Sequence, residues 1–272
     1  MTEKPGLGII GCGQMGKALF QGLIKQEMEL GKIAVFDIDH TRSAELARQT
    51  KTARAADSAV SLAEAVDVII VAVKPHQVAL ILQEIRPALR RNQILISVAA
   101  GIPLEVLQAE AGPDIPVVRV MPNVPSLVGQ GALGISFSLS VNETQKALII
   151  ELFEALGLVE EVPEALMDAV TALSGSGPAF IFLVAEALCD GAVSVGMPRD
   201  MARRLTDQTI LGSAAMLQQT GEHPAVLRER ITSPGGTTIA GLGALERGGT
   251  RGIFYDAVKE AFMRSQQIKS QQ

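Results

Sequence analysis

The chain has 272 residues, of which 47% are apolar and 19% charged, and its formal net charge is −5. Such a length and composition are typical of an ordinary globular protein that buries a substantial core in one large or two modest domains. The acidic balance, the scattered Lys and Arg residues and the 3% aromatic content disfavour nucleic acid as a partner, because neither a basic surface nor a base-stacking platform is expected.

Neither a targeting segment nor a metal site is expected. The N-terminus, Met1-Thr2-Glu3-Lys4-Pro5, runs into an apolar segment without the basic start, apolar core and cleavage site of a signal peptide, which favours a cytoplasmic location. The two cysteines, Cys12 and Cys189, form no CxxC or Cys/His cluster, so no disulfide framework or zinc site is indicated. Residues 169–185 are uncharged, but the turn at 174–178 is expected to break a spanning helix, so no membrane partner is predicted.

The first half of the chain alternates short apolar runs with amphipathic stretches, which predicts βαβ units and a mainly parallel sheet. Strands are expected at residues 7–10, 33–36, 68–73, 94–98 and 117–120. Helices are expected at residues 17–26, 43–49 and 75–85, where apolar residues recur at helical spacing. Two further strands, near 132–137 and 158–161, are expected to extend the sheet around a helix at 141–156.

After about Pro163 the strand signals stop and helix signals replace them. Helices are expected at residues 178–195, 199–220, 224–231, 238–248 and 250–267, and residues 269–272 are expected to be disordered. The predicted fold class is therefore α/β. A Rossmann-like, doubly wound, mainly parallel sheet is expected over residues 1–163, followed by an all-helical domain over residues 164–272.

A glycine-rich turn follows the first expected strand and reads Gly11-Cys12-Gly13-Gln14-Met15-Gly16. In this position Gly11 permits the tight turn, Gly13 lets the backbone approach a pyrophosphate, and Gly16 lets the helix pack on the strand. The N-terminus of the following helix would face the phosphates with free N–H groups. The pattern predicts a dinucleotide site; the alternative is a strand-to-helix turn without a ligand.

The second expected strand ends at Asp37, about twenty residues after the last glycine, where a carboxylate can accept hydrogen bonds from the adenosine ribose. A carboxylate at this position favours NAD, because it would repel the additional phosphate of NADP. Arg42 is near enough in sequence to accommodate that phosphate, so NADH and NADPH both remain candidates. The other interpretation of Asp37 is a turn residue beside Asp39.

The later strands end at the same edge of the expected sheet, where doubly wound folds bind ligands. Lys74 follows the third expected strand and precedes a helix that begins with a proline, so it is a candidate for contact with cofactor or substrate, or else a solvated loop residue. Small residues after the other strands would leave room for a nicotinamide and its ribose. The cofactor candidates at this edge are Ala72, Val73, Lys74, Pro75, Ala99, Ala100, Gly101 and Asn123.

The most unusual segment of the second half is Thr232-Ser233-Pro234-Gly235-Gly236-Thr237-Thr238, directly before an expected helix. Gly235 and Gly236 expose backbone N–H groups, hydroxyls from Ser233, Thr237 and Thr238 flank them, and the helix directs its positive end at the segment. This arrangement is suited to a small carboxylate. The other interpretation is a capped helix start after a proline turn.

Residues 227–246, which contain this segment, closely resemble the signature of pyrroline-5-carboxylate reductases. Residues 72–76, 98–101, 173–179 and 222–224 resemble the same family. The resemblance implies NAD(P)H-dependent reduction of 1-pyrroline-5-carboxylate to L-proline, the last step of proline biosynthesis. It also implies a homodimer formed by helical domains, often assembled into a decamer, and commonly a preference for NADPH, with which Asp37 disagrees.

The resemblance implies roles for the residues of the second half as well. Ser233, Gly235, Gly236, Thr237 and Thr238 would surround the substrate, with Thr238 as hydrogen-bond or proton donor to the ring nitrogen and Lys74 as a second catalytic candidate. An alcohol dehydrogenase normally needs a positioned His, Lys or Tyr, and residues 180–195 contain no Lys, His or Asn. The alternatives are a β-hydroxyacid or 6-phosphogluconate type of dehydrogenase, and a non-catalytic NAD(P)-sensing protein.

Overall fold

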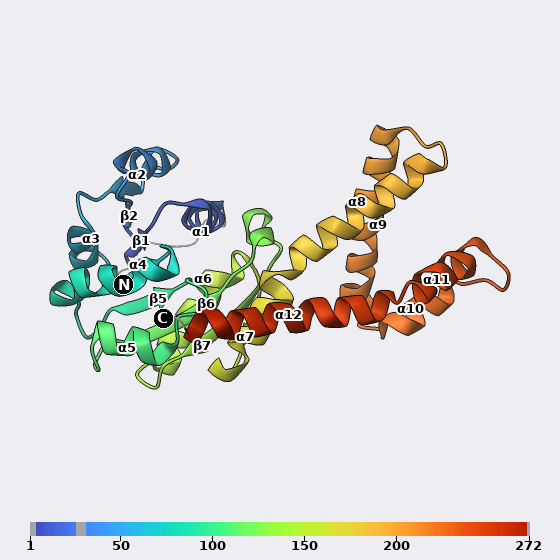
Figure 1. Ribbon diagram of the computed structural model, residues 1–272. Helices are drawn as coiled ribbons and strands as arrows, with labels where there is room; N and C mark the ends of the chain where they lie inside the picture. Colours follow the sequence, from blue (N-terminus) through green and yellow to red (C-terminus); the bar gives the residue numbers. More distant parts are fainter. Residues whose placement is uncertain (1–3, 26–30, 271–272) are drawn as a thin grey trace. The chain divides into compact units, whose positions relative to one another are not determined.

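The computed structural model describes residues 4–25 and 31–270. Contacts between residues divide the chain into two compact units (Figure 1). Unit 1 comprises residues 1–176 together with 261–272, and unit 2 comprises residues 177–260. Unit 1 carries the sheet and unit 2 is helical throughout.

Unit 1 is built on one eight-stranded sheet of order β3-β2-β1-β4-β5-β6-β7-β8. All neighbouring strands are parallel except β6 and β7, so that β7 and β8 run opposite to the other six. The strands are β1 (Leu7–Ile10), β2 (Ile33–Phe36), β3 (Ala53–Ala55), β4 (Val68–Val71), β5 (Ile94–Ser97), β6 (Val117–Met121), β7 (Gly131–Phe137) and β8 (Gly157–Glu161). The predicted doubly wound, mainly parallel sheet is confirmed.

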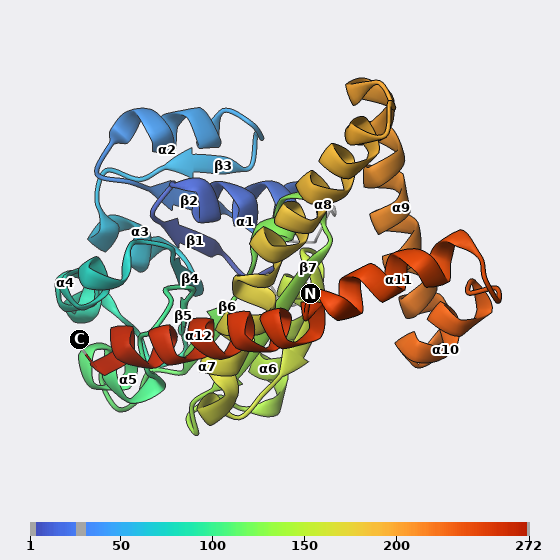
Figure 2. The ribbon, with the colours of Figure 1, turned by 45° about the vertical axis from the view of Figure 1, so that its right-hand side comes forward.

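Helices cover both faces of this sheet (Figure 2), as the continuous apolar runs of its central strands require. One buried cluster joins the strands to α1 (Gln14–Lys25), α2 (His40–Ala47) and α6 (Glu143–Glu154). The second cluster joins them to α3 (Ala59–Ala65), α4 (Pro75–Ile85) and α5 (Leu104–Ala111). Successive residues of β1 alternate between the clusters: Ile9 belongs to the first and Ile10 to the second.

The sequence predicts some elements with their bounds and misses others. β1, β2 and α4 have the expected bounds, whereas β3, α3 and α5 were not expected. β3 has three residues at the edge of the sheet, only Ala53 of which is buried, so it lacks the apolar run that marks the other strands. α1 begins at Gln14, earlier than expected, and the expected last residue of that helix, Gln26, lies outside the described residues.

The division between the units falls after Ser176, later than the boundary at residue 163 that the sequence predicts. The cause is packing, because the turns η3 (Glu164–Leu166), α7 (Met167–Val170) and η4 (Thr171–Gly175) belong to unit 1. Asn123 at the end of β6 donates a hydrogen bond of 3.0 Å to Ser174 O. The hydroxyl of Ser265 donates to Asp168 Oδ1 at 2.7 Å, which ties the last turns of α12 to α7.

Unit 2 consists of α8 (Gly177–Ser194), α9 (Arg199–Thr220), α10 (Pro224–Arg230), α11 (Thr237–Arg247) and the larger part of α12 (Thr250–Ser270). α8 and α9 pack against each other as a helical hairpin. The helices predicted in this half are all present. The expectation of a disordered tail is wrong for residues 269 and 270, which extend α12, and residues 271 and 272 lie outside the described part of the chain.

The expected break at residues 174–178 is also wrong. Residues 171–175 form a π-helical turn, closed by the hydrogen bond from Ser176 N to Thr171 O at 2.9 Å, and the chain continues directly into α8. The helical stretch Glu164–Ser194 is therefore long and apolar enough, by length and composition alone, to cross a membrane. This is weak evidence, because a helix that packs in a protein interface has the same composition.

A buried ion pair fixes the chain where the helical region begins. Arg119 lies on β6 with a side chain that is 3% exposed, and its Nη1 is 3.2 Å from Oε1 of Glu164, whose side chain is 30% exposed. The same oxygen accepts the backbone N–H of Leu104 at the start of α5. Glu164 thus satisfies a buried cation and a helix N-terminus together, which is the condition under which burying a charge is tolerated.

We expect Glu164→Ala to lower the free energy of unfolding by about 2 to 4 kcal/mol, because Arg119 would keep a buried charge without its partner. Urea unfolding of both proteins measures the difference. Asp114→Ala is the control, since Asp114 pairs with Arg91 at 3.0 Å on the surface, where both side chains are more than half exposed. It should cost less than about 1 kcal/mol, and equal effects of the two substitutions would contradict the role of Glu164.

Candidate functional site

The glycine turn between β1 and α1 is shaped by two close backbone approaches. Gly11 has a φ of +99°, and a Cβ on it would lie 2.7 Å from Ala72 O. A Cβ on Gly16 would overlap the carbonyl oxygen of Gly11. Gly13 differs, because no described atom lies within 4 Å of the position its Cβ would take. The backbone at Gly13 therefore faces open space, as a surface that receives a pyrophosphate must.

The first turn of α1 provides the second half of a phosphate site. The helix begins at Gln14, with Lys17 N donating to Gly13 O at 2.9 Å, and its first turn has no acidic residue. Gln14 is exposed and Met15 packs against the core. The leading N–H groups of a helix lack intrahelical acceptors and carry positive potential. The turn and the helix start thus favour an anion at Gly13.

Asp37 connects this turn to the end of β2. The residue is 9% exposed, its Oδ2 accepts the N–H of Cys12 at 2.7 Å, and its Oδ1 accepts the N–H of Asp39 at 2.9 Å. The sequence left open whether Asp37 is a turn residue or a ribose ligand. Its bond to Asp39 is a turn bond, but its bond to Cys12 reaches the glycine turn itself, and a carboxylate with two engaged oxygens keeps lone pairs for further donors.

Cys12 is a structural residue of the turn. Burial raises the pKa of its thiol to about 12, the negative charge of Asp37 adds to this increase, and Arg42 opposes it. The thiol is therefore neutral at physiological pH, and its Sγ lies 3.6 Å from Phe36 O. A neutral, buried thiol is a poor nucleophile.

The remaining cofactor candidates lie after β4 and β5, which are parallel neighbours of β1 and β4, so their carboxyl ends share one edge of the sheet. Ala72 and Val73 are half-buried, Ala99 is buried, and Ala100 is half-buried. Gly101 is buried with a φ of +81°. These residues have small side chains apart from Val73, and room for a nicotinamide along this edge stays a prediction.

Lys74 stands at the N-terminus of α4, before Pro75, and its side chain is exposed. Its backbone N–H donates to Gln77 Oε1 at 3.3 Å, which holds the start of the helix. The structure gives Lys74 the position at the strand end that the sequence predicts. A catalytic role for its ammonium group stays a prediction.

Asn123 has a structural function that sequence reasoning missed. It is 7% exposed, its Nδ2 donates to Ser174 O at 3.0 Å, and its Oδ1 accepts the N–H of Ala132 at 3.0 Å. The carboxamide thereby joins the end of β6 to β7 and to η4. These partners lie 9 and 51 residues away along the chain, so no local pattern could identify them.

The predicted anion cradle lies in unit 2. Gly235 has a φ of +68°, Gly236 N donates to Ser233 O at 3.1 Å, and a Cβ on Gly236 would overlap the Ser233 hydroxyl. α11 begins at Thr237, and within the described residues no side chain caps its N-terminus at Gly236. Thr238, on the first turn, is half-buried. The helix start thus has no side-chain cap at Gly236, and the anion cradle stays a prediction.

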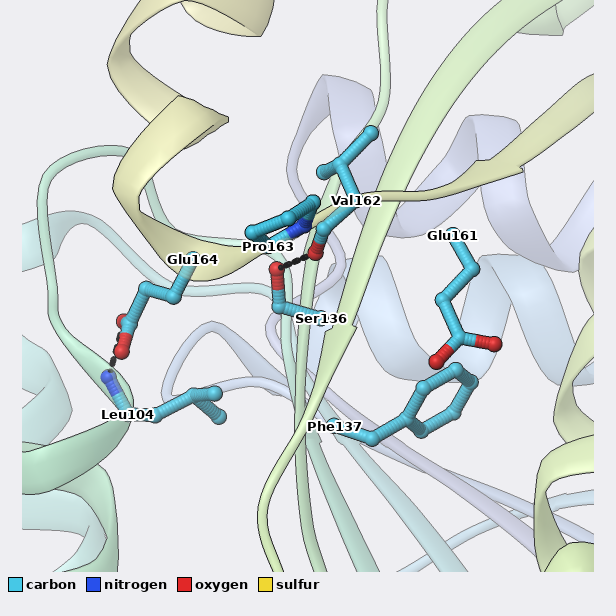
Figure 3. A pocket seen from close by; sticks show the side chains of 7 residues that line it. All are labelled: Leu104, Ser136, Phe137, Glu161, Val162, Pro163 and Glu164. Carbon is cyan, nitrogen blue, oxygen red and sulfur yellow. Dashed lines mark hydrogen bonds between the residues drawn. The ribbon is translucent and has the colours of Figure 1, made fainter.

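A cavity of about 510 Å³ lies elsewhere in unit 1 and contains none of the predicted site residues (Figure 3). Its polar lining groups are engaged by protein partners. The hydroxyl of Ser136 donates to Val162 O at 2.7 Å, Glu161 accepts from Lys146 at 3.2 Å, and Glu164 accepts the N–H of Leu104. Over the described ranges there is also no group of three or more His, Cys, Asp or Glu side chains suited to a metal ion.

Gly13 and Gly16 should respond differently to substitution. We expect Gly13→Asp to fold normally but to lose dinucleotide binding, because its side chain enters open space in the free protein and occupies the place of the pyrophosphate. Gly16→Ala should instead lower the melting temperature, because its Cβ meets the carbonyl of Gly11. Cofactor titration and thermal unfolding of both variants separate the effects, and full binding by Gly13→Asp would refute the site.

Two family models match separate parts of the chain. A family model described as NADP oxidoreductase, coenzyme F420-dependent, matches residues 6–101, and one described as pyrroline-5-carboxylate reductase dimerisation matches residues 164–268. Pyrroline-5-carboxylate reductase of Methanosarcina acetivorans is 41% identical over 267 residues, which cover 98% of each chain.

Two solved structures resemble the fold of the whole chain. The pyrroline-5-carboxylate reductase of Coxiella burnetii has a TM-score of 0.91 at 33% identity and covers 97% of this chain and 98% of its own. The pyrroline carboxylate reductase of Plasmodium falciparum, with NADP bound, has a TM-score of 0.88 at 32% identity, covering 99% and 100%. The resemblance seen in the sequence is thus confirmed, and the chain belongs to the pyrroline-5-carboxylate reductase family.

Proposed function

We propose that the chain reduces the cyclic imine 1-pyrroline-5-carboxylate to L-proline, with unit 1 holding NAD(P)H and the Ser233–Thr238 segment holding the substrate. Membership of the family makes the protein an NAD(P)H-dependent oxidoreductase that acts on a C=N bond. The observation that carries the residue assignment is the uncapped N-terminus of α11, which follows two glycines in the segment by which the sequence resembles the family.

The residues of unit 1 fit a dinucleotide. The open space at Gly13 and the first turn of α1 would receive the pyrophosphate, and Asp37 would accept the hydroxyls of the adenosine ribose. The small residues after β4 and β5 would border the nicotinamide half. The bound cofactor supplies the hydride, and the protein's part is to fix its position and to keep the strand ends accessible.

The cradle of unit 2 fits the substrate's carboxylate. Gly236 N already donates to Ser233 O, which leaves the amides of the first turn of α11 and the hydroxyls of Ser233 and Thr237 for an anion. This arrangement holds a carboxylate without a cationic side chain. In our proposal Thr238 donates a hydrogen bond to the ring nitrogen, so that substrate orientation is set at both ends.

The chemistry requires little from the side chains. A cyclic imine that arrives protonated is already an activated hydride acceptor, so the protein contributes orientation and proton supply at the nitrogen. An alcohol dehydrogenase would need a side chain that moves the hydroxyl proton, and α8, which follows the Ser174–Gly177 turn, contains no Lys, His or Asn. No observation favours that alternative or a non-catalytic sensor.

The match to a dimerisation family model supports a homodimer, and the surface of unit 2 explains the need for one. Only Cys189, Ala202 and Thr206 are buried among the described residues of this unit. Large apolar side chains are exposed on α8, α9, α11 and α12, including Ile181, Phe182, Leu183, Leu188, Leu205, Leu211, Leu245, Ile253, Phe254 and Tyr255. An apolar surface of this extent is stable in water only when it is covered. We propose that a second copy covers it, that dimers assemble further into a decamer, and that the enzyme works in the cytoplasm.

We expect Phe182→Asp to yield aggregated or unfolded protein, because Phe182 is 63% exposed in one chain and would place a charge within the proposed interface. Size-exclusion chromatography and circular dichroism measure the outcome. Leu139→Asp is the matched control, since Leu139 is fully exposed on the turn between β7 and α6 and should tolerate the charge. A folded, active monomer of Phe182→Asp would contradict the dimer.

The activity is tested by following oxidation of NADH and of NADPH with a panel of cyclic imino acids. We expect 1-pyrroline-5-carboxylate to be reduced with the highest catalytic efficiency, and proline to be the product. Turnover of a β-hydroxyacid but of no imine would refute the proposal. Binding of either dinucleotide without any turnover would favour the sensor.

The role of Thr238 is tested by Thr238→Ala. Loss of a hydrogen-bond donor in a catalytic site typically costs about 2 to 4 kcal/mol in the transition state, so turnover should fall about a hundredfold or more while cofactor affinity is kept. If the hydroxyl only supports the helix start, stability should fall by about 1 kcal/mol and turnover should stay within a few-fold. Melting temperature and turnover of one preparation, with Thr209→Ala as a control for an exposed helical hydroxyl, distinguish the outcomes.

A further inference from the structure

We infer that this chain selects NADH over NADPH, and that Asp37 and Asp39 together exclude the 2′-phosphate. The inference rests on the proposed cofactor site. It goes beyond that site because it chooses between the two cofactors, and it differs from the NADP named for the family model over residues 6–101 and for the Plasmodium falciparum structure. The basis is the arrangement of charges and helix-end amides after β2.

Asp37 directly follows β2, where its carboxylate could accept a hydrogen bond from a ribose hydroxyl. Its carboxylate is held on both oxygens by backbone N–H groups, from Cys12 at 2.7 Å and from Asp39 at 2.9 Å. These bonds hold the side chain in place and prevent it from turning away. A 2′-phosphate carries a charge of about −2 near neutral pH, so it would meet a fixed negative charge that cannot be moved without breaking the glycine turn.

Asp39 engages the two groups that could otherwise bind a 2′-phosphate, namely the N-terminus of α2 and the guanidinium of Arg42. Its Oδ1 accepts the N–H of Thr41 at 3.1 Å and so caps the N-terminus of α2, where an anion would otherwise bind. Its Oδ2 lies 3.2 Å from Nε of Arg42, the cation that could pair with the phosphate. Both side chains of this pair are about half exposed, so the contact is weak in stability but still neutralises the guanidinium.

Of the two carboxylates, that of Asp39 pairs with the guanidinium of Arg42, whereas that of Asp37 accepts the N–H groups of Cys12 and Asp39. The neighbouring His40 is exposed at the start of α2, and its ring packs edge-on against Phe36 with centroids 6.0 Å apart. A ribose with two hydroxyls finds acceptors here. A ribose with a phosphate finds repulsion and an occupied helix end.

The test compares Kd for NADH and NADPH in the wild type, Asp37→Ser, Asp39→Asn and the double variant. Asp39→Asn is the critical variant, because Asn caps a helix as well as Asp while removing the charge and releasing Arg42. The matched control is Asp114→Asn, which removes one carboxylate from the exposed pair with Arg91. Fluorescence titration of the reduced nicotinamide gives both constants, and circular dichroism verifies folding.

We expect the wild type to bind NADH at least about tenfold more tightly than NADPH, and each Asp substitution to move the ratio toward NADPH by about tenfold. Asp114→Asn should leave the ratio unchanged. Adding Arg42→Gln to Asp39→Asn should remove the gained NADPH affinity. If the wild type binds NADPH as tightly as NADH, or if Asp39→Asn leaves the ratio within about twofold, the inference is overturned.

The catalytic efficiencies with 1-pyrroline-5-carboxylate and each cofactor provide a second measurement. They should follow the same ratio as the dissociation constants. Absence of turnover with either cofactor, alongside the expected binding ratio, would contradict the proposed reaction and leave the cofactor selectivity standing. The two proposals therefore fail separately.

Discussion

The geometry of the proposed cofactor site in unit 1 depends on the hydrogen bond from the N–H of Cys12 to Oδ2 of Asp37. It joins the glycine turn after β1 to the end of β2. In the proposed site, one contact therefore sets both the surface for a pyrophosphate and the acceptor for a ribose. The buried backbone at this point cannot reach water, and the carboxylate supplies the acceptor it needs. Because Gly11 and Gly16 approach neighbouring backbone closely, the turn has little freedom to adjust. The shape of the proposed cofactor site follows from this packing.

Unit 2, unlike unit 1, has few buried side chains in the single chain. Unit 1 has two buried clusters on its sheet, whereas the helices of unit 2 leave most of their large apolar side chains exposed in the single chain. Five helices with so few buried residues gain little from the hydrophobic effect until a second surface covers them. The Ser233–Thr238 segment is carried by these helices. Formation of the substrate site is therefore coupled, in our proposal, to assembly of the dimer.

The sequence predicts those features that local patterns encode. β1 and β2 are apolar runs, and the glycine turn lies directly between β1 and α1. The sequence therefore predicts the two strands and the turn with their residues. β3, with one buried residue, and the seven-residue α3 carry too short a pattern. The pair of Arg119 and Glu164 and the bonds of Asn123 to Ser174 span 45 and 51 residues, and only the folded topology brings such partners together. The π-helical turn at residues 171–175 likewise depends on tertiary contacts, because α7 directly before it packs against β7 and Asn123 donates a hydrogen bond to Ser174 O.

Selectivity between the two nicotinamide cofactors can change without change in the fold. Asp39 and Arg42 are exposed and contribute no side chain to either buried cluster. A substitution that keeps the cap of α2, such as Asp39→Asn, therefore leaves the sheet and its helices intact. A chain with 33% identity to the Coxiella burnetii protein still has a TM-score of 0.91, which shows how far side chains can differ on one backbone. The core determines where the end of β2 lies relative to the glycine turn, and the residues after that strand determine which ribose it accepts. Fold similarity therefore establishes the class of cofactor, whereas the charges beside Asp37 decide between its two members.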